Sequence, residues 1–159
     1  MSPTKEQNIA VTYASPIGLL KIEYASGDLK RIARTSKKSP VPKVIPASLQ
    51  QSLQQLTAYF AGKQPVFSVP SHLQGTAFQQ KVWAETARIP LGKVATYSDI
   101  AQKIGHPQAV RAVGTALKKN PFCIVVPCHR VVPKSGGVGD YALGKTAKKW
   151  LLQREGVAF

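Results

Sequence analysis

The pattern of apolar and polar positions divides the chain into a strand-rich first part and a helix-rich second part. Over residues 8–34, apolar side chains alternate with other residues, and turn signals interrupt the alternation at residues 15–18 and 26–28. This pattern predicts a small antiparallel sheet. Residues 35–46 are rich in Lys, Ser and Pro and predict a loop, while residues 48–61 place four apolar side chains at helical spacing.

Residues 63–74 have the composition of a linker between the two parts. We therefore expect a supporting N-terminal domain with its linker over residues 1–74, and a second domain over residues 75–159. The predicted fold class is α+β, with a small N-terminal antiparallel sheet plus a helix, followed by a mostly helical C-terminal domain. A length of 159 residues suits one compact unit of about 150 residues, or one full domain with a smaller appendage.

The second part opens with a predicted helix over residues 77–89 and continues with two shorter helices. Residues 96–99 have the form of a capping box in which Asp takes the place of Glu, and Gly105 closes the helix that follows. Residues 106–107 (His-Pro) predict the start of the next helix, with Pro at its first position. Two short helices around a glycine-containing turn fit a helix-turn-helix, whose second helix carries Arg111 in its first turns. A surface residue on an amphipathic helix is the alternative reading of Arg111.

The charge balance indicates a class of partner. The chain has 22 Lys and Arg against 7 Asp and Glu, which gives a formal net charge of +15. Residues 1–74 hold 9 basic and 3 acidic side chains, and residues 75–159 hold 13 and 4, so the charge is spread over both halves. Such a chain is attracted to polyanions, nucleic acid first. A solvated basic surface is the alternative.

The cysteines and histidines predict no metal site. Cys123 and Cys128 lie five apart on what reads as one extended segment, a spacing that matches no zinc pattern and is poor for a disulfide. We read Cys123 as core packing. The N-terminus lacks the apolar core of a signal peptide, and no apolar run approaches the roughly 20 residues that span a membrane. We expect a reducing compartment, in which a free thiolate persists.

Chemistry is expected around Cys128. Residues 124–126 predict a buried strand, which runs directly into residues 127–130 (Pro-Cys-His-Arg). A thiol reacts as its thiolate and needs a base or a positive environment, which His129 and the adjoining arginine can supply. Glu155, at the end of a last predicted helix, is a candidate to orient the imidazole. A buried structural cysteine beside an ordinary surface histidine is the alternative.

Residues 127–131 (Pro-Cys-His-Arg-Val) resemble the active-site motif of the O6-alkylguanine-DNA alkyltransferases, also called methylated-DNA–protein-cysteine methyltransferases. The resemblance runs from Gly75 to Gly156, about half of the chain. Further segments match the family in order: residues 76–79 with 82–83, 89–93 with 96–97, 111–114, 120–121, 139–141 with 144, 151–152 and 155–156. Residues 1–74 resemble the family only in outline, and they lack the cysteine and histidine cluster that forms a zinc site in some members.

The resemblance implies DNA repair by direct, stoichiometric transfer of an alkyl group from O6-alkylguanine to Cys128. Each molecule then acts once and needs no cofactor. The family's roles imply that Glu155 holds His129, and that His129 deprotonates Cys128 through a water. They also imply that Tyr141 donates a proton toward the leaving guanine, and that Asn120 braces the active-site turn.

The implied partner is double-stranded DNA containing O6-alkylguanine, from which the target nucleotide is flipped out of the base stack. By resemblance, Tyr97 pushes on the phosphate beside the flipped nucleotide and Arg111 fills the gap in the duplex. Small residues such as Ala112 and Gly114 let the helix approach the minor groove, where an arginine meets a strongly negative potential. We expect a monomer in the cytoplasm or nucleus, with cooperative binding on DNA as a further option.

Three other functions share parts of this pattern. A DNA-binding regulator could use Cys128 as a redox sensor, and would show disulfide or sulfenate chemistry. A cysteine hydrolase could use Cys128, His129 and Glu155, but it leaves the charge and Arg111 unexplained. A lesion sensor would bind the damaged base without reacting.

Overall fold

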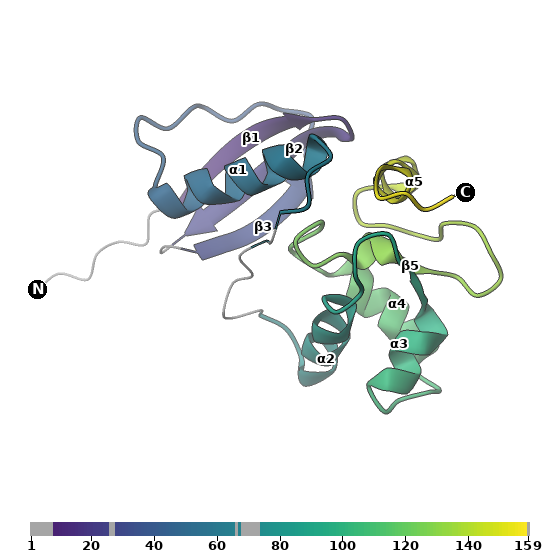
Figure 1. Cartoon of the computed structure of the whole chain (residues 1–159). Coiled ribbons are helices and arrows are strands. Elements are labelled where there is room, and N and C mark those ends of the chain that lie inside the picture. Colours follow the sequence, from purple (N-terminus) through teal and green to yellow (C-terminus); the bar gives the residue numbers. More distant parts are fainter. Residues whose placement is uncertain (1–7, 26–27, 66, 68–73, 159) are drawn as a thin grey trace, which may run out of the picture. The chain divides into compact units, whose positions relative to one another are not determined.

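The computed structural model describes residues 8–25, 28–65, 67 and 74–158. They belong to two compact units, residues 1–70 and residues 71–159, whose helices and strands are labelled in Figure 1. The stretch expected to be a linker, residues 63–74, lies in part outside the described residues, as do residues 26–27 of the second expected turn.

The first unit is an antiparallel sheet with one helix packed on it (Figure 1). Its elements are β1 (Asn8–Ser15), β2 (Gly18–Ala25), β3 (Asp28–Arg34) and α1 (Ala47–Phe60), with the strands paired in the order β1-β2-β3. Ser15 pairs with Gly18 across a tight turn, in which Gly18 takes a φ of 114° that favours glycine. The sheet predicted over residues 8–34 and the helix predicted over residues 48–61 are confirmed.

Alternate residues of β2 supply the core of this unit. Leu20 and Ile22 are fully buried, and the Tyr24 hydroxyl is hydrogen-bonded to Ser48 at the start of α1. Leu49 and Leu56, seven residues apart on α1, are buried from the helix side. The period of two along the strand and the helical period along α1 therefore bring two apolar faces into one core.

The second unit is mostly helical, with one short parallel strand pair. Its elements are α2 (Ala77–Thr86), β4 (Ala95–Thr96), α3 (Tyr97–Lys103), α4 (Val110–Lys118), the 3-10 turn η1 (Cys128–Arg130), β5 (Val131–Val132) and α5 (Lys145–Arg154). β4 pairs with β5, and α2, α3 and α4 pack on one another. Trp83 Nε1 of α2 donates a hydrogen bond to the Ala116 carbonyl of α4 at 2.9 Å. The predicted α+β fold is therefore confirmed.

The capping box predicted for α3 is present. Thr96 Oγ1 accepts a hydrogen bond from the Asp99 backbone N–H at 3.0 Å, and Asp99 Oδ2 accepts one from the Thr96 backbone N–H at 2.9 Å. These bonds from Thr96 hold the pKa of Asp99 below its ordinary value. A shorter Asp therefore closes the box as Glu does in the usual motif, and it fixes the direction in which α3 leaves β4.

Helix α4 begins later than the sequence predicted. It starts at Val110, whereas His106-Pro107 precedes it as a separate turn in which the Ala109 N–H bonds the His106 carbonyl at 2.9 Å. The prediction was wrong because Pro suits the second position of a β-turn as well as the first position of a helix. Val110, the first residue of α4, is 37% exposed, while Val113 one turn later is buried.

We expect Thr96→Ala to lower the free energy of unfolding of the second unit by about 1 kcal/mol, because the α3 N–H groups lose their cap. Both tryptophans, Trp83 and Trp150, belong to this unit, so denaturant unfolding followed by tryptophan fluorescence reports on it alone. Thr96→Ser keeps the capping hydroxyl and is the matched control. An equal loss in both variants would contradict a capping role.

Candidate active site

Residues 122–126 form a tight turn that positions the acceptor candidate Cys128. The Val126 N–H donates to the Phe122 carbonyl at 2.8 Å, and Ile124 has a φ of 78°. Cys128 then begins the single 3-10 turn η1. The strand predicted over residues 124–126 was therefore wrong. Its apolar side chains are buried as predicted, but a short apolar run fits a buried turn as well as a buried strand.

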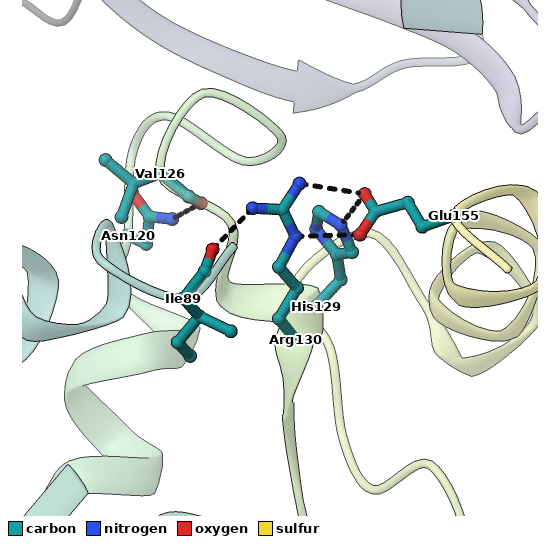
Figure 2. A network of polar contacts seen from close by, with 6 residues as sticks. All are labelled: Ile89, Asn120, Val126, His129, Arg130 and Glu155. Carbon is teal, nitrogen blue, oxygen red and sulfur yellow. Dashed lines mark hydrogen bonds and ion pairs between the residues drawn. The ribbon is translucent and has the colours of Figure 1, made fainter. Parts of the chain in front are cut away.

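Asn120 holds this turn from inside. Its Nδ2 donates to the Val126 carbonyl at 2.9 Å (Figure 2), and its Oδ1 accepts from the Phe122 N–H at 2.9 Å. Asn120 itself is buried. An amide side chain suits this place because it offers a donor and an acceptor at once. The two bonds fix both sides of the turn that leads to Cys128.

Cys128 lines a cavity of about 380 Å³ in the second unit. The cavity brings together five of the residues that sequence analysis singled out: Tyr97, Arg111, Gly114, Cys128 and Tyr141. Asn120, His129 and Glu155 are buried and are not among its lining residues, and Ala112 is exposed on α4. The cavity is thus lined both by helices α3 and α4 and by the segment that carries Cys128.

A buried ion-pair network stands beside the cysteine. His129 Nε2 lies 2.6 Å from Glu155 Oε2, and Arg130 Nε donates to Glu155 Oε1 at 2.7 Å (Figure 2). Arg130 also donates to the Ile89 carbonyl at 2.7 Å. One carboxylate therefore accepts hydrogen bonds from both residues that follow Cys128. The sequence suggested Glu155 as the partner of His129, but it gave no sign that Arg130 shares the carboxylate.

The network determines which nitrogen of His129 can act as a base. A carboxylate only accepts hydrogen bonds, so the Nε2 that faces Glu155 carries the proton and Nδ1 is the acceptor. Nδ1 is buried and makes no hydrogen bond to any residue in the described part of the chain. Burial lowers the pKa of His129, and the opposing effect of Glu155 offsets this only in part. The imidazole is therefore neutral near pH 7 and can take a proton at Nδ1.

The two cysteines lie next to each other. Their Sγ atoms are 4.0 Å apart, and both thiols are free. The expectation of one extended segment was wrong, because the turn at residues 122–126 folds the chain back between them. Hydrogen bonding from Cys123 lowers the pKa of Cys128 against the opposing effect of burial, with smaller contributions from Asn120 and the Lys148 charge. Cys128 is thus the thiol that ionises first.

Lys148 is a site residue that the sequence analysis missed. It is 1% exposed, and its Nζ donates to the Val131 carbonyl at 2.6 Å, to the Asp140 carbonyl at 3.1 Å and to the Tyr97 hydroxyl at 3.4 Å. Burial lowers the pKa of Lys148 to about 8. The sequence did hold a sign that Lys148 is buried, because Lys148 stands four residues before the buried Leu152 and so on the same apolar face of α5.

Gly139 permits a close approach at the cavity wall. Its φ is 77°, and a Cβ built on it would lie 2.9 Å from the Pro133 ring and 3.0 Å from the Tyr97 hydroxyl. A larger residue would therefore force the Pro133 ring or the Tyr97 hydroxyl to move. Burial raises the pKa of Tyr97, so its hydroxyl stays protonated. The ring of Tyr141 stands edge-on to that of His129, with centroids 6.3 Å apart.

Neither a cluster of metal ligands nor a membrane-spanning helix is present among the described residues. No group of three or more Cys, His, Asp or Glu side chains there is placed to hold a metal ion. None of the helices described is both long and apolar enough to cross a membrane.

Comparison with known proteins places this site in a family. Residues 77–157 match the family model described as the DNA-binding domain of 6-O-methylguanine DNA methyltransferase. A methylated-DNA–protein-cysteine methyltransferase of Methanosarcina acetivorans is 40% identical over 149 residues, 91% of this chain and 96% of the relative. A probable methylated-DNA–protein-cysteine methyltransferase of Acanthamoeba polyphaga mimivirus is 44% identical over 144 residues, 87% of this chain and 91% of the relative.

Solved structures agree with these relatives. The O6-methylguanine methyltransferase of Mycobacterium tuberculosis superimposes with a TM-score of 0.82 at 37% identity, over 94% of this chain and 93% of that one. The Mycobacterium tuberculosis protein OGT in complex with DNA superimposes with a TM-score of 0.81 at 38% identity, over 92% of each chain. The chain therefore belongs to the methylated-DNA–protein-cysteine methyltransferase family.

Proposed function

We propose that this protein repairs DNA by moving the alkyl group of O6-alkylguanine onto Cys128 Sγ. The observation that carries the proposal is that Cys128, the thiol with the lowered pKa, lines the same cavity as Arg111 of α4. A reactive sulfur and a candidate DNA-contacting side chain thus face one space. The family membership supports the same reaction.

The proposed transfer is a displacement at carbon. Cys128 thiolate attacks the alkyl carbon, the S–C bond forms, and the C–O6 bond breaks with its electron pair left on the guanine. His129 Nδ1 takes the Cys128 proton through one bridging water, while Glu155 accepts the Nε2 hydrogen bond and stabilises the imidazolium. Tyr141, whose hydroxyl is buried beside the cavity, gives a proton toward the leaving guanine. Asn120 keeps the turn in place throughout.

The proposed product explains why one molecule acts once. A thioether on Cys128 has no leaving group that a neighbouring side chain could displace, and no cofactor is needed to form it. The acceptor is consumed with the lesion.

We propose that the DNA is bound through its minor groove by the α3–α4 helix-turn-helix. Arg111 is exposed on α4 at the cavity rim and can replace the flipped nucleotide in the stack. Exposed Ala112 and half-buried Gly114 leave the helix surface flat for close approach. Tyr97, whose hydroxyl meets Lys148, is held where it can press on the phosphate.

The first test is intact-protein mass after mixing with a duplex that contains one O6-methylguanine. We expect the wild type to gain one methyl group and never more than one, because Cys128 is the only acceptor. Cys128→Ala and an undamaged duplex are the controls, and both should give no gain. If the wild type gains no mass but still binds the lesion, the protein is a sensor. Repeated turnover would exclude the single-use reaction.

The second test uses pH and Glu155→Gln. Because the pKa of His129 is lowered, the neutral base persists as pH falls, and the wild-type rate should drop only below the ordinary His value of about 6.5. Glu155→Gln removes the charge that stabilises the imidazolium, so we expect single-turnover transfer to slow by about 100-fold.

Glu23→Gln, an exposed carboxylate of the first unit, is the matched control and should transfer at the wild-type rate. A thermal melt checks that Glu155→Gln remains folded. A folded Glu155→Gln with an unchanged rate and pH profile would exclude the proposed role of the His129–Glu155 pair.

The third test asks whether Arg111 acts by position or by charge alone. Arg111→Ala should slow transfer from a duplex by about 10-fold or more, because the gap left by the flipped nucleotide is no longer filled. Arg88→Ala removes the same charge from an exposed side chain on another part of the unit. If the two variants lose the same share of the transfer rate at one salt concentration, Arg111 contributes only general electrostatic attraction to DNA.

A further inference from the structure

Cys123 is a second thiol in contact with the proposed acceptor. Its Sγ lies 4.0 Å from Cys128 Sγ and 3.9 Å from the Asn120 carbonyl oxygen. It is 1% exposed, and it is not among the residues that line the cavity, whereas Cys128 is. A small molecule that enters the cavity therefore meets Cys128 first, with Cys123 directly behind it. In alkyl transfer as proposed above, Cys123 acts only through the hydrogen bond that lowers the pKa of Cys128.

We propose that Cys123 is a resolving thiol for Cys128: when a peroxide oxidises Cys128, the two residues join in a reversible intramolecular disulfide. The inference concerns the cysteine that the proposed function uses, but it depends only on the two thiols and not on alkyl transfer.

The geometry requires a small movement. An S–S bond is about 2 Å long, so the sulfurs must approach by about 2 Å from their present separation. Closing this gap requires the Cys123 side chain to turn away from the Asn120 carbonyl, which lies 3.9 Å from its Sγ. The backbone stays in place, because Cys123 pairs with Val126 and Asn120 bonds the Val126 carbonyl. The turn therefore holds the two cysteines near each other in both redox states.

The reaction balances with a peroxide as the only oxidant. Cys128 thiolate attacks one peroxide oxygen, the O–O bond breaks, and Cys128 becomes a sulfenic acid while hydroxide leaves and takes up a proton as water. Cys123 sulfur then attacks the sulfenic sulfur, and the S–O bond breaks. The thiol proton leaves with the hydroxyl group as a second water. Two thiols have lost two electrons, and hydrogen peroxide has become two waters.

The electrostatics give the two thiols this order. The pKa of Cys128 is lowered, whereas that of Cys123 is raised well above its ordinary value, first by hydrogen bonding to Cys128, then by burial and by the Cys128 charge. Cys128 is thus the thiolate that meets the oxidant. Once Cys128 is a neutral sulfenic acid, its negative charge no longer opposes ionisation of Cys123. The first oxidation therefore makes the second thiol easier to ionise.

A disulfide would protect Cys128 from irreversible oxidation. Sulfenic acid that meets no thiol can be oxidised further to sulfinic acid, which a thiol reductant does not reverse. A Cys123–Cys128 bond stops this sequence at a reducible stage. It also occupies the sulfur, so the oxidised protein cannot accept an alkyl group until it is reduced.

The test is peroxide treatment of the whole chain without DNA, followed by mass spectrometry under non-reducing conditions. Trypsin cleaves after Lys119 and Arg130, so residues 120–130 form one peptide that contains both cysteines. We expect this peptide from the wild type to lose two hydrogens, about 2 Da, and to regain them with dithiothreitol. Cys123→Ser keeps a hydroxyl donor of similar size but cannot form the bond, and we expect it to accumulate sulfinic acid, a gain of about 32 Da, at Cys128.

Cys123→Ala is a second variant, and tryptophan fluorescence verifies that each variant is folded. Loss of two hydrogens in the wild type alone, reversed by dithiothreitol, supports the proposal. Sulfinic acid on wild-type Cys128 as fast as in Cys123→Ser, disulfide-linked dimers in place of the internal bond, or two thiols that still react with iodoacetamide would each overturn it. Methyl transfer to the untreated protein is measured separately, so failure of the repair reaction and failure of the disulfide are distinguishable.

Discussion

Two hydrogen bonds made by one buried amide hold the segment on which the whole site depends. Asn120 satisfies the Phe122 N–H and the Val126 carbonyl, and each would cost about 1–3 kcal/mol if left buried and unpaired. Asp could accept but not donate when ionised, and Leu could do neither. The amide therefore makes the tight turn possible, and the turn puts Cys128 at the cavity and Cys123 behind it. The lowered pKa of Cys128 therefore depends on the position in which this turn holds its sulfur.

The carboxylate of Glu155 connects three parts of the second unit that are far apart in sequence. It lies at the end of α5 and accepts hydrogen bonds from His129 and Arg130 of η1, while Arg130 also bonds the Ile89 carbonyl after α2. A buried carboxylate is stable only with such partners. The same contacts fix the tautomer and orientation of the imidazole. The contacts that stabilise the buried carboxylate are therefore also the ones that leave Nδ1 of His129 as the acceptor nitrogen.

Much of this architecture could be predicted from sequence where local rules act alone. The alternation over residues 8–34 and the capping box at Thr96 depend on neighbouring residues, and both predictions were confirmed. The buried run at residues 124–126 was misread because its conformation is set by Asn120, a contact that periodicity does not encode. Lys148 was missed because a charged residue is usually counted as surface. What the sequence alone could not supply was the set of contacts between segments.

The buried ammonium of Lys148 makes the stability of the second unit increase with pH above about 8. Its pKa is about 8 in the folded protein, while a lysine in an unfolded chain titrates near 10.4, about two units higher. Between these values the unfolded chain binds more protons than the folded one, so this group makes folding more favourable as pH rises through that window. The Lys148 ammonium bonds the Tyr97 hydroxyl and the Val131 carbonyl. The folded protein therefore holds the proton of this ammonium less firmly than the unfolded chain does. At pH values near 8 the charge of Lys148, whose Nζ bonds the hydroxyl of the cavity-lining Tyr97, therefore varies with the pH of the solution.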